Sequence, residues 1–120
     1  MIVSIIDDDE AVVDSLRALL ESYGLRTSGY TSARDFLARP DDPPTRCIVV
    51  DMHMPEMSGL ELLALLKARG TMLPAVMITG RGEENLAERA ARLGAAGVLR
   101  KPIDDAVLVT LIREIMGNDP

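Results

Sequence analysis

Four short runs of apolar residues recur along the chain, and they constrain its fold more than any other feature. They are residues 2–6, 47–50, 75–78 and 97–100. Each is four or five residues long, and the Val and Ile that dominate the first three favour strands. Because their apolarity is continuous rather than alternating, both faces of each strand should be covered, as in a parallel sheet between two layers of helices. A fifth and more polar run, residues 25–30, is a candidate edge strand.

Helical patterns fill the spaces between these runs, and glycines often follow them as C-terminal caps. We expect helices ending near Tyr23, over 32–38, over 59–69, over 83–93 and from near Asp104 onward. Ser58 and Glu61 form a predicted capping box for the third helix. The apolar stripes of the first and last helices comprise Val13, Leu16, Leu20 and Tyr23, and Val107, Leu108, Leu111, Ile112 and Ile115. Strands that alternate with helices through five units indicate one α/β domain, residues 1–120, with right-handed crossovers.

Charge and cysteine content exclude several classes of function. The 120 residues carry a formal net charge of -6, which disfavours direct contact with nucleic acid and favours a hard cation or a basic partner surface. The single Cys47 cannot form an internal disulfide, which suits a reducing cytosol. We expect a cytoplasmic domain without a signal peptide or a membrane-spanning segment.

Polar residues follow or end four of the five predicted strands. Asp7 and Asp8 follow the run at 2–6, and Asp51 follows the run at 47–50. Thr79 follows the run at 75–78, and Lys101 follows the run at 97–100. Each residue alone has an ordinary explanation, such as a solvated turn or a surface lysine. Parallel strands, however, bring their carboxyl ends to one edge of the sheet, where ligands bind in open α/β folds. The coincidence at four strand ends therefore predicts one site.

The chemistry of this predicted site favours phosphoryl transfer. Three clustered carboxylates raise one another's pKa unless a cation joins them, and an all-oxygen, open site favours Mg²⁺. A carboxylate beside Mg²⁺ and a lysine is equipped to attack a phosphoryl group, because the metal and the ammonium neutralise charge on the phosphoryl oxygens. The hydroxyl of Thr79 can donate to one more of these oxygens.

The segments "IIDDDE", "IVVDMHMPEMSGLELL", "VMITGRG" and "VLRKP" occur in this order, and together they resemble a receiver domain of a two-component response regulator. The resemblance covers essentially the whole chain. It implies a doubly wound, flavodoxin-like three-layer sandwich with five parallel strands in the order 2-1-3-4-5 and five helices. It also implies a phosphorylation-activated switch whose phosphoryl donor is a sensor histidine kinase, a histidine phosphotransfer protein or a small acyl phosphate. A phosphorylation-dependent homodimer is a further candidate partner.

The resemblance assigns a role to each acidic residue. Asp51 is implied to be the phosphoacceptor. Asp8 and Asp51 are implied to ligate Mg²⁺ directly, together with the backbone carbonyl of His53, whereas Asp7 acts through water. Such a protein is not an enzyme in the usual sense, because it catalyses only its own phosphorylation and dephosphorylation.

Two further residues are implied to bind the phosphoryl group, namely Thr79 and Lys101. The resemblance also implies a cis peptide bond between Lys101 and Pro102. The chain departs from the family at Val98, where receivers usually carry a Tyr or Phe that swings inward on activation. We therefore expect coupling from Thr79 into the helix beginning near Glu83.

Two other functions stay open at this point. A haloacid-dehalogenase-like phosphatase also uses a strand-end Asp, Mg²⁺, a Thr and a Lys, but it typically has a second Asp at the position of His53. A receiver-like interaction module that is never phosphorylated is the other alternative. Residues 32–38 and 59–70 resemble receivers that precede a helix-turn-helix domain, which suggests transcription regulation, although a single-domain regulator is equally open.

Overall fold

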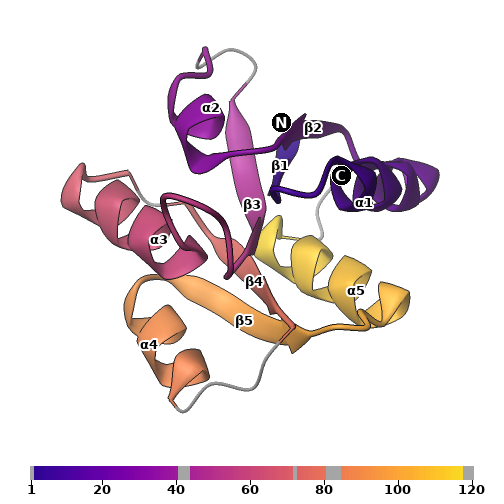
Figure 1. Cartoon of the computed structure of the whole chain (residues 1–120). Coiled ribbons are helices and arrows are strands. Elements are labelled where there is room, and N and C mark those ends of the chain that lie inside the picture. Colours follow the sequence, from indigo (N-terminus) through magenta and orange to yellow (C-terminus); the bar gives the residue numbers. More distant parts are fainter. Residues whose placement is uncertain (1, 41–43, 72, 81–84, 118–120) are drawn as a thin grey trace.

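A computed structural model describes residues 2–40, 44–71, 73–80 and 85–117. Within these ranges, five strands alternate with five helices (Figure 1). In chain order they are β1 (Ile2–Ile6), α1 (Glu10–Ser22), β2 (Thr27–Tyr30), α2 (Ala33–Leu37), β3 (Thr45–Asp51), α3 (Gly59–Ala68), β4 (Ala75–Thr79), α4 (Leu86–Arg92), β5 (Ala95–Arg100) and α5 (Asp105–Ile115).

The strands form one parallel sheet in the order β2-β1-β3-β4-β5, as expected. The order reverses between β1 and β3, and at such a switch point the carboxyl ends of two strands open a crevice. Helices α1 and α5 cover one face of the sheet, and α2, α3 and α4 cover the other (Figure 1). The predicted three-layer α/β sandwich is therefore confirmed.

Burial explains why the strand runs are continuously apolar. Every residue of β1 and β4 is buried, so neither face of these strands meets water. Side chains of one strand pack alternately into the core under α1 and α5 and into the core under α2, α3 and α4. In β2, Thr27 alone is buried, which confirms the expectation of a more polar edge strand.

Two predicted members of the helical stripes are not in the core. Tyr23 is 43% exposed because α1 ends at Ser22, and the guanidinium of Arg113 lies over its ring, 5.6 Å from the centroid. Val107 is 45% exposed because the buried face of α5 is centred on Leu108, Val109 and Ile112. The predictions for Tyr23 and Val107 were therefore wrong, and Val109 was missed.

Several boundaries differ from the predictions. Strand β3 begins two residues early, at Thr45, and includes Asp51. Helix α4 begins at Leu86, after Asn85 in the left-handed region with φ 61°. Glu83, near which we expected this helix to begin, lies outside the described residues.

Helix α3 begins with the predicted capping box. The backbone N–H of Glu61 donates to Ser58 Oγ at 3.1 Å, and the backbone N–H of Ser58 donates to Glu61 Oε1 at 2.9 Å.

Among the described residues, no helix is both long and apolar enough to cross a membrane.

Gly59, the first residue of α3, lies against the backbone of β3. Its N–H donates to the carbonyl of Met52 at 2.9 Å. A Cβ atom at this position would lie 2.8 Å from the backbone oxygen of Asp51 and 3.2 Å from Cα of Met52. Only glycine therefore allows α3 to start this close to the end of β3.

We predict that Gly59→Ala lowers the free energy of unfolding by roughly 1–3 kcal/mol, because the added methyl overpacks against backbone that cannot rotate away. Urea denaturation measures the change. Gly80→Ala is the matched control, since the nearest atom to its added Cβ would be Lys101 Cδ at 3.9 Å. Equal stability of the two variants would contradict the importance of this contact.

Candidate functional site

An open depression of about 440 Å³ lies at the carboxyl edge of the sheet. Residues that follow or end β1, β3, β4 and β5 line it, namely Asp7, Asp8, Asp9, Asp51, His53, Gly80 and Lys101. The sequence predicted this convergence from the positions of the strand ends. Of the predicted site residues, Thr79 alone is not in the lining; it ends β4 beside Gly80 and is 1% exposed.

The backbone holds Asp7 and Asp51 in place. Asp7 directly follows β1, and its N–H donates to the carbonyl of Tyr30 at 3.1 Å. Asp51 is the last residue of β3, and the N–H of the next residue donates to the carbonyl of Ile78 at 2.7 Å. Asp7 is 3% exposed and Asp51 is 5% exposed, whereas Asp8 is exposed. Two of the three carboxylates are therefore largely removed from water.

Lys101 is the cation of this site. Its Nζ lies 3.3 Å from Asp51 Oδ1 and 4.0 Å from Asp7 Oδ2. Its backbone N–H donates to the carbonyl of Thr79 at 2.9 Å, which continues the pairing of β5 with β4. The Lys101–Pro102 peptide bond is cis, as the family resemblance implied.

Burial raises the pKa of both enclosed carboxyl groups. The pKa of Asp51 is raised mainly by loss of water, although the nearby charge of Lys101 opposes the rise. Burial raises the pKa of Asp7 to about 6, and the N–H of Asp9, which donates to Asp7 Oδ1 at 2.9 Å, offsets part of the effect. The negative charge of Asp51 raises this pKa further. The site therefore has too little positive charge for its carboxylates.

The donor set fits a hard divalent cation. One carboxylate oxygen from each of Asp7, Asp8 and Asp51 lies within 4.8 Å of the others. Ligand oxygens around Mg²⁺ lie ~2.1 Å from the ion, so two of them are at most about 4.2 Å apart. A small side-chain movement, or a water between one carboxylate and the ion, would close the difference. The cluster could hold a metal ion.

The loop after Asp51 turns sharply. Glu56 has φ 68°, in the left-handed region that residues other than glycine adopt at some cost, and the N–H of Met57 donates to the carbonyl of Pro55 at 2.7 Å. His53, at the start of this loop, is exposed and lines the depression. The loop thus leaves the sheet edge and returns to it at Gly59.

Asp9 is a site residue that the sequence analysis did not single out. It lines the depression, donates its backbone N–H to Asp7, and accepts a hydrogen bond from the N–H of Ala11 as the N-cap of α1. A recognisable signal was present, because an Asp directly before a helical pattern is a preferred N-cap.

Val98 lies in β5, beside Met77 of β4, and is partly buried against the core under α2, α3 and α4. The coupling route that we predicted from Thr79 passes through residues 81–84, which lie outside the described residues.

Comparison with known proteins places this chain in a family. The sequence model of one protein family, described as the response regulator receiver domain, matches residues 3–113. The transcriptional regulatory protein FixJ of Azorhizobium caulinodans is 47% identical over 116 residues, which cover 97% of this chain and 55% of that protein. The chain spans about half the length of the curated relatives that it matches.

Solved structures agree with this assignment. The crystal structure of FixJ-N has a TM-score of 0.85 at 35% identity, with 99% of this chain and 95% of that chain covered. A response regulator receiver protein from Pseudoalteromonas atlantica has a TM-score of 0.89 at 25% identity, with 98% of each chain covered. The chain therefore belongs to the response regulator receiver domain family of two-component signalling.

Proposed function

We propose that Asp51 accepts a phosphoryl group from a phosphohistidine of a sensor histidine kinase or a histidine phosphotransfer protein. The observation that carries this proposal is the ammonium of Lys101, 3.3 Å from Asp51 Oδ1 at a strand end that also bears Asp7 and Asp8. A nucleophile, a cation and a candidate metal site thus share one open depression. A donor protein can reach this depression from solvent.

In the proposed step, a carboxylate oxygen of Asp51 attacks the phosphorus atom. The P–N bond of the phosphohistidine breaks, its electron pair returns to the imidazole, and an acyl phosphate forms. Lys101 is placed to hold one phosphoryl oxygen, and we assign the hydroxyl of Thr79 to another. Dephosphorylation would be a separate hydrolysis step, in which water attacks the phosphorus, the P–O bond to Asp51 breaks, and inorganic phosphate leaves while the carboxylate is restored. The domain would then catalyse only its own phosphorylation and dephosphorylation.

Mg²⁺ is the metal that we assign to the carboxylates. Asp8 and Asp51 would bind it directly with the backbone carbonyl of His53, and Asp7 would act through water. When bound, the ion neutralises charge on the phosphoryl oxygens. The raised pKa of Asp7 and of Asp51 supports the assignment, because an added cation favours the ionised form of each group.

The two alternative functions have less support. A haloacid-dehalogenase-like phosphatase would need an acid two residues after Asp51, where this chain has His53. An interaction module that is never phosphorylated would not need the close approach of Lys101 to a buried carboxylate.

For the whole protein we propose cytoplasmic transcription regulation. The support is the similarity over this domain to a transcriptional regulatory protein of about twice its length. The 120 residues would act as one receiver domain, with an output domain such as a helix-turn-helix domain outside them. Phosphorylation could promote a homodimer, and nucleic acid would be bound by the output domain.

We predict that the chain gains one phosphoryl group when it is incubated with acetyl phosphate and Mg²⁺. Intact-mass spectrometry measures the added mass. Asp51→Asn should abolish the gain, because an amide oxygen is a poor nucleophile, whereas Asp14→Asn on the exposed side of α1 should leave it unchanged. Persistent labelling of Asp51→Asn would exclude Asp51 as the acceptor.

We predict that Asp7→Asn stabilises the metal-free protein at pH 7. A carboxyl group with a pKa of about 6 in the folded state and 3.8 as its ordinary value opposes folding once it is ionised. A pKa difference of about two units corresponds to at most about 3 kcal/mol in the free energy of unfolding. The gain in the free energy of unfolding should be complete above about pH 6. It should disappear as the pH falls to about 4, where Asp7 of the wild type binds the proton in both the folded and the unfolded chain.

Urea denaturation of Asp7→Asn and wild type across this pH range tests the prediction. Asp14→Asn is the matched control and should give no comparable gain. A gain of Asp7→Asn that persists undiminished at pH 4 would mean that ionisation of Asp7 is not its cause.

We predict that Mg²⁺ raises the melting temperature of the wild type, because it relieves repulsion among the three carboxylates. The stabilisation grows as RT ln(1 + [Mg²⁺]/Kd). Asp8→Ala should remove most of the shift, and Glu10→Ala, which alters a nearby exposed acid, should not. Differential scanning calorimetry measures the three proteins, and the same shift in all of them would place the ion elsewhere.

A further inference from the structure

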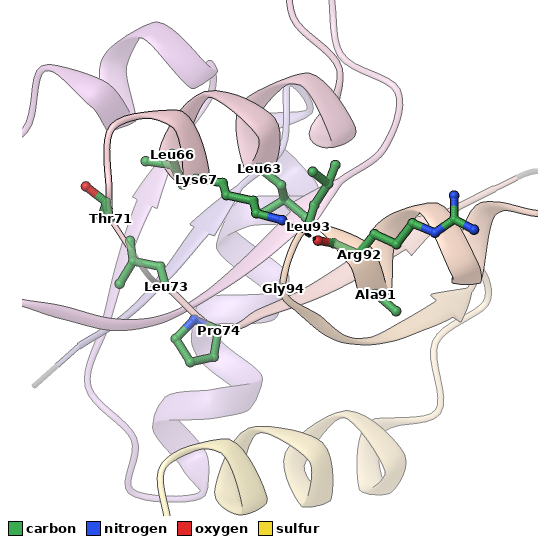
Figure 2. A pocket seen from close by; sticks show the side chains of 10 residues that line it. All are labelled: Leu63, Leu66, Lys67, Thr71, Leu73, Pro74, Ala91, Arg92, Leu93 and Gly94. Carbon is green, nitrogen blue, oxygen red and sulfur yellow. Dashed lines mark hydrogen bonds between the residues drawn. The ribbon is translucent and has the colours of Figure 1, made fainter.

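A second pocket lies at the opposite edge of the sheet from the acidic depression. It has a volume of about 350 Å³ and lies between the end of α3, the end of α4 and the segment that leads into β4 (Figure 2). β4 begins beside it at Ala75 and ends at Thr79, about 13 Å away at ~3.3 Å per residue. The pocket is therefore separate from the proposed phosphorylation site but shares a strand with it.

The walls of this pocket are mainly leucine side chains. Leu63 and Leu66 of α3 come from the core and are 2% and 5% exposed, whereas Leu73 and Leu93 are partly buried (Figure 2). Ligand pockets in proteins typically have volumes of about 300–1,000 Å³ and apolar walls with a few polar groups. This pocket lies at the small end of that range, so it suits the tail of a small apolar molecule.

Two cationic residues line the same pocket, and Figure 2 shows the guanidinium of Arg92 pointing away from the ammonium of Lys67. The ammonium of Lys67 crosses from α3 to α4 and donates to the backbone carbonyl of Arg92 at 3.0 Å (Figure 2). An ammonium has three N–H donors, so a bound anion can accept another of them. Arg92 adds a second exposed positive charge in a chain whose net charge is -6. The local charge therefore selects for an anion.

We propose that this pocket binds a small amphipathic carboxylate of the medium-chain fatty acid type. The alkyl tail would lie against Leu63, Leu66 and Leu93, and the carboxylate would bind the ammonium of Lys67. A neutral molecule of the same shape would lose the attraction between a carboxylate and the ammonium, and a cation would be repelled. This proposal does not depend on phosphorylation of Asp51.

The bound molecule would connect α3 with α4. Helix α4 has seven residues, no side-chain hydrogen bond at its N-cap, and two buried side chains, Leu86 and Ala90. Its anchorage is therefore slight, and a ligand that contacts both helices should hold it against α3. Hydrogen exchange of the α4 amides should slow when the ligand binds.

Nuclear magnetic resonance on the 120-residue chain tests the proposal, with octanoate as the probe. Saturable shifts should centre on the methyl groups of Leu63, Leu66, Leu73 and Leu93. The matched probes 1-octanol and octyltrimethylammonium should bind about tenfold more weakly, because neither carries a negative charge to pair with the ammonium of Lys67. No saturable shift, or shifts centred on another surface, would overturn the proposal.

Variants separate recognition of the carboxylate from the shape of the pocket. Lys67→Met keeps the length of the stem, and it should weaken octanoate binding about tenfold while leaving octanol binding unchanged. Arg69→Met alters an exposed cation outside the pocket and should leave octanoate binding unchanged. Leu73→Trp should fill the pocket and abolish binding of both probes in a protein that still gives a folded spectrum. Equal weakening of octanoate and octanol by Lys67→Met would overturn the role of its charge.

Discussion

The removal of Asp7 and Asp51 from water is the constraint on which the rest of this domain depends. Parallel strand pairing fixes the backbone at both positions, so the two carboxylates stay at the same edge of the sheet. Burial raises the pKa of each, and the ammonium of Lys101 compensates only in part. Enclosing two carboxylates at one edge of the sheet costs free energy unless a cation compensates, so a bound cation should stabilise this edge.

The surrounding structure keeps these groups close together. Gly59 lets α3 begin against the backbone of Asp51, and Asp9 donates its N–H to Asp7 while it caps α1. The N–H of Lys101 bonds to the carbonyl of Thr79, which ties the end of β5 to the end of β4. Each contact involves at least one backbone group of a strand end or a helix start, so the site is built on rigid elements. Such a scaffold can hold a reacting carboxylate in a fixed position.

Much of this arrangement was predictable from the sequence because it follows from strand order and strand ends. Continuous apolar runs predict buried parallel strands, and parallel strands bring Asp7, Asp51 and Lys101 to one edge whatever the details of packing. The exposure of Tyr23 and Val107 was not predictable, because it depends on where α1 ends and on how α5 is rotated against the sheet. The pocket between α3 and α4 also depends on the fit of two helices. Neither Lys67 nor Arg92 carries a local signal for it.

Formal charges at the proposed site suggest separate tasks for Lys101 and Thr79 in the proposed reaction. Three carboxylates and one ammonium leave a charge of minus two, which one divalent cation would neutralise. Conversion of the Asp51 carboxylate into a doubly charged acyl phosphate would then leave minus one in a partly buried depression. A hydroxyl cannot neutralise that charge, but it can solvate it, and Thr79 at the end of β4 is the residue to which we assign this role. Val98 offers no aromatic ring to carry a signal. We therefore expect coupling to α4 to begin with the hydrogen bond that the hydroxyl of Thr79 would donate to the phosphoryl group.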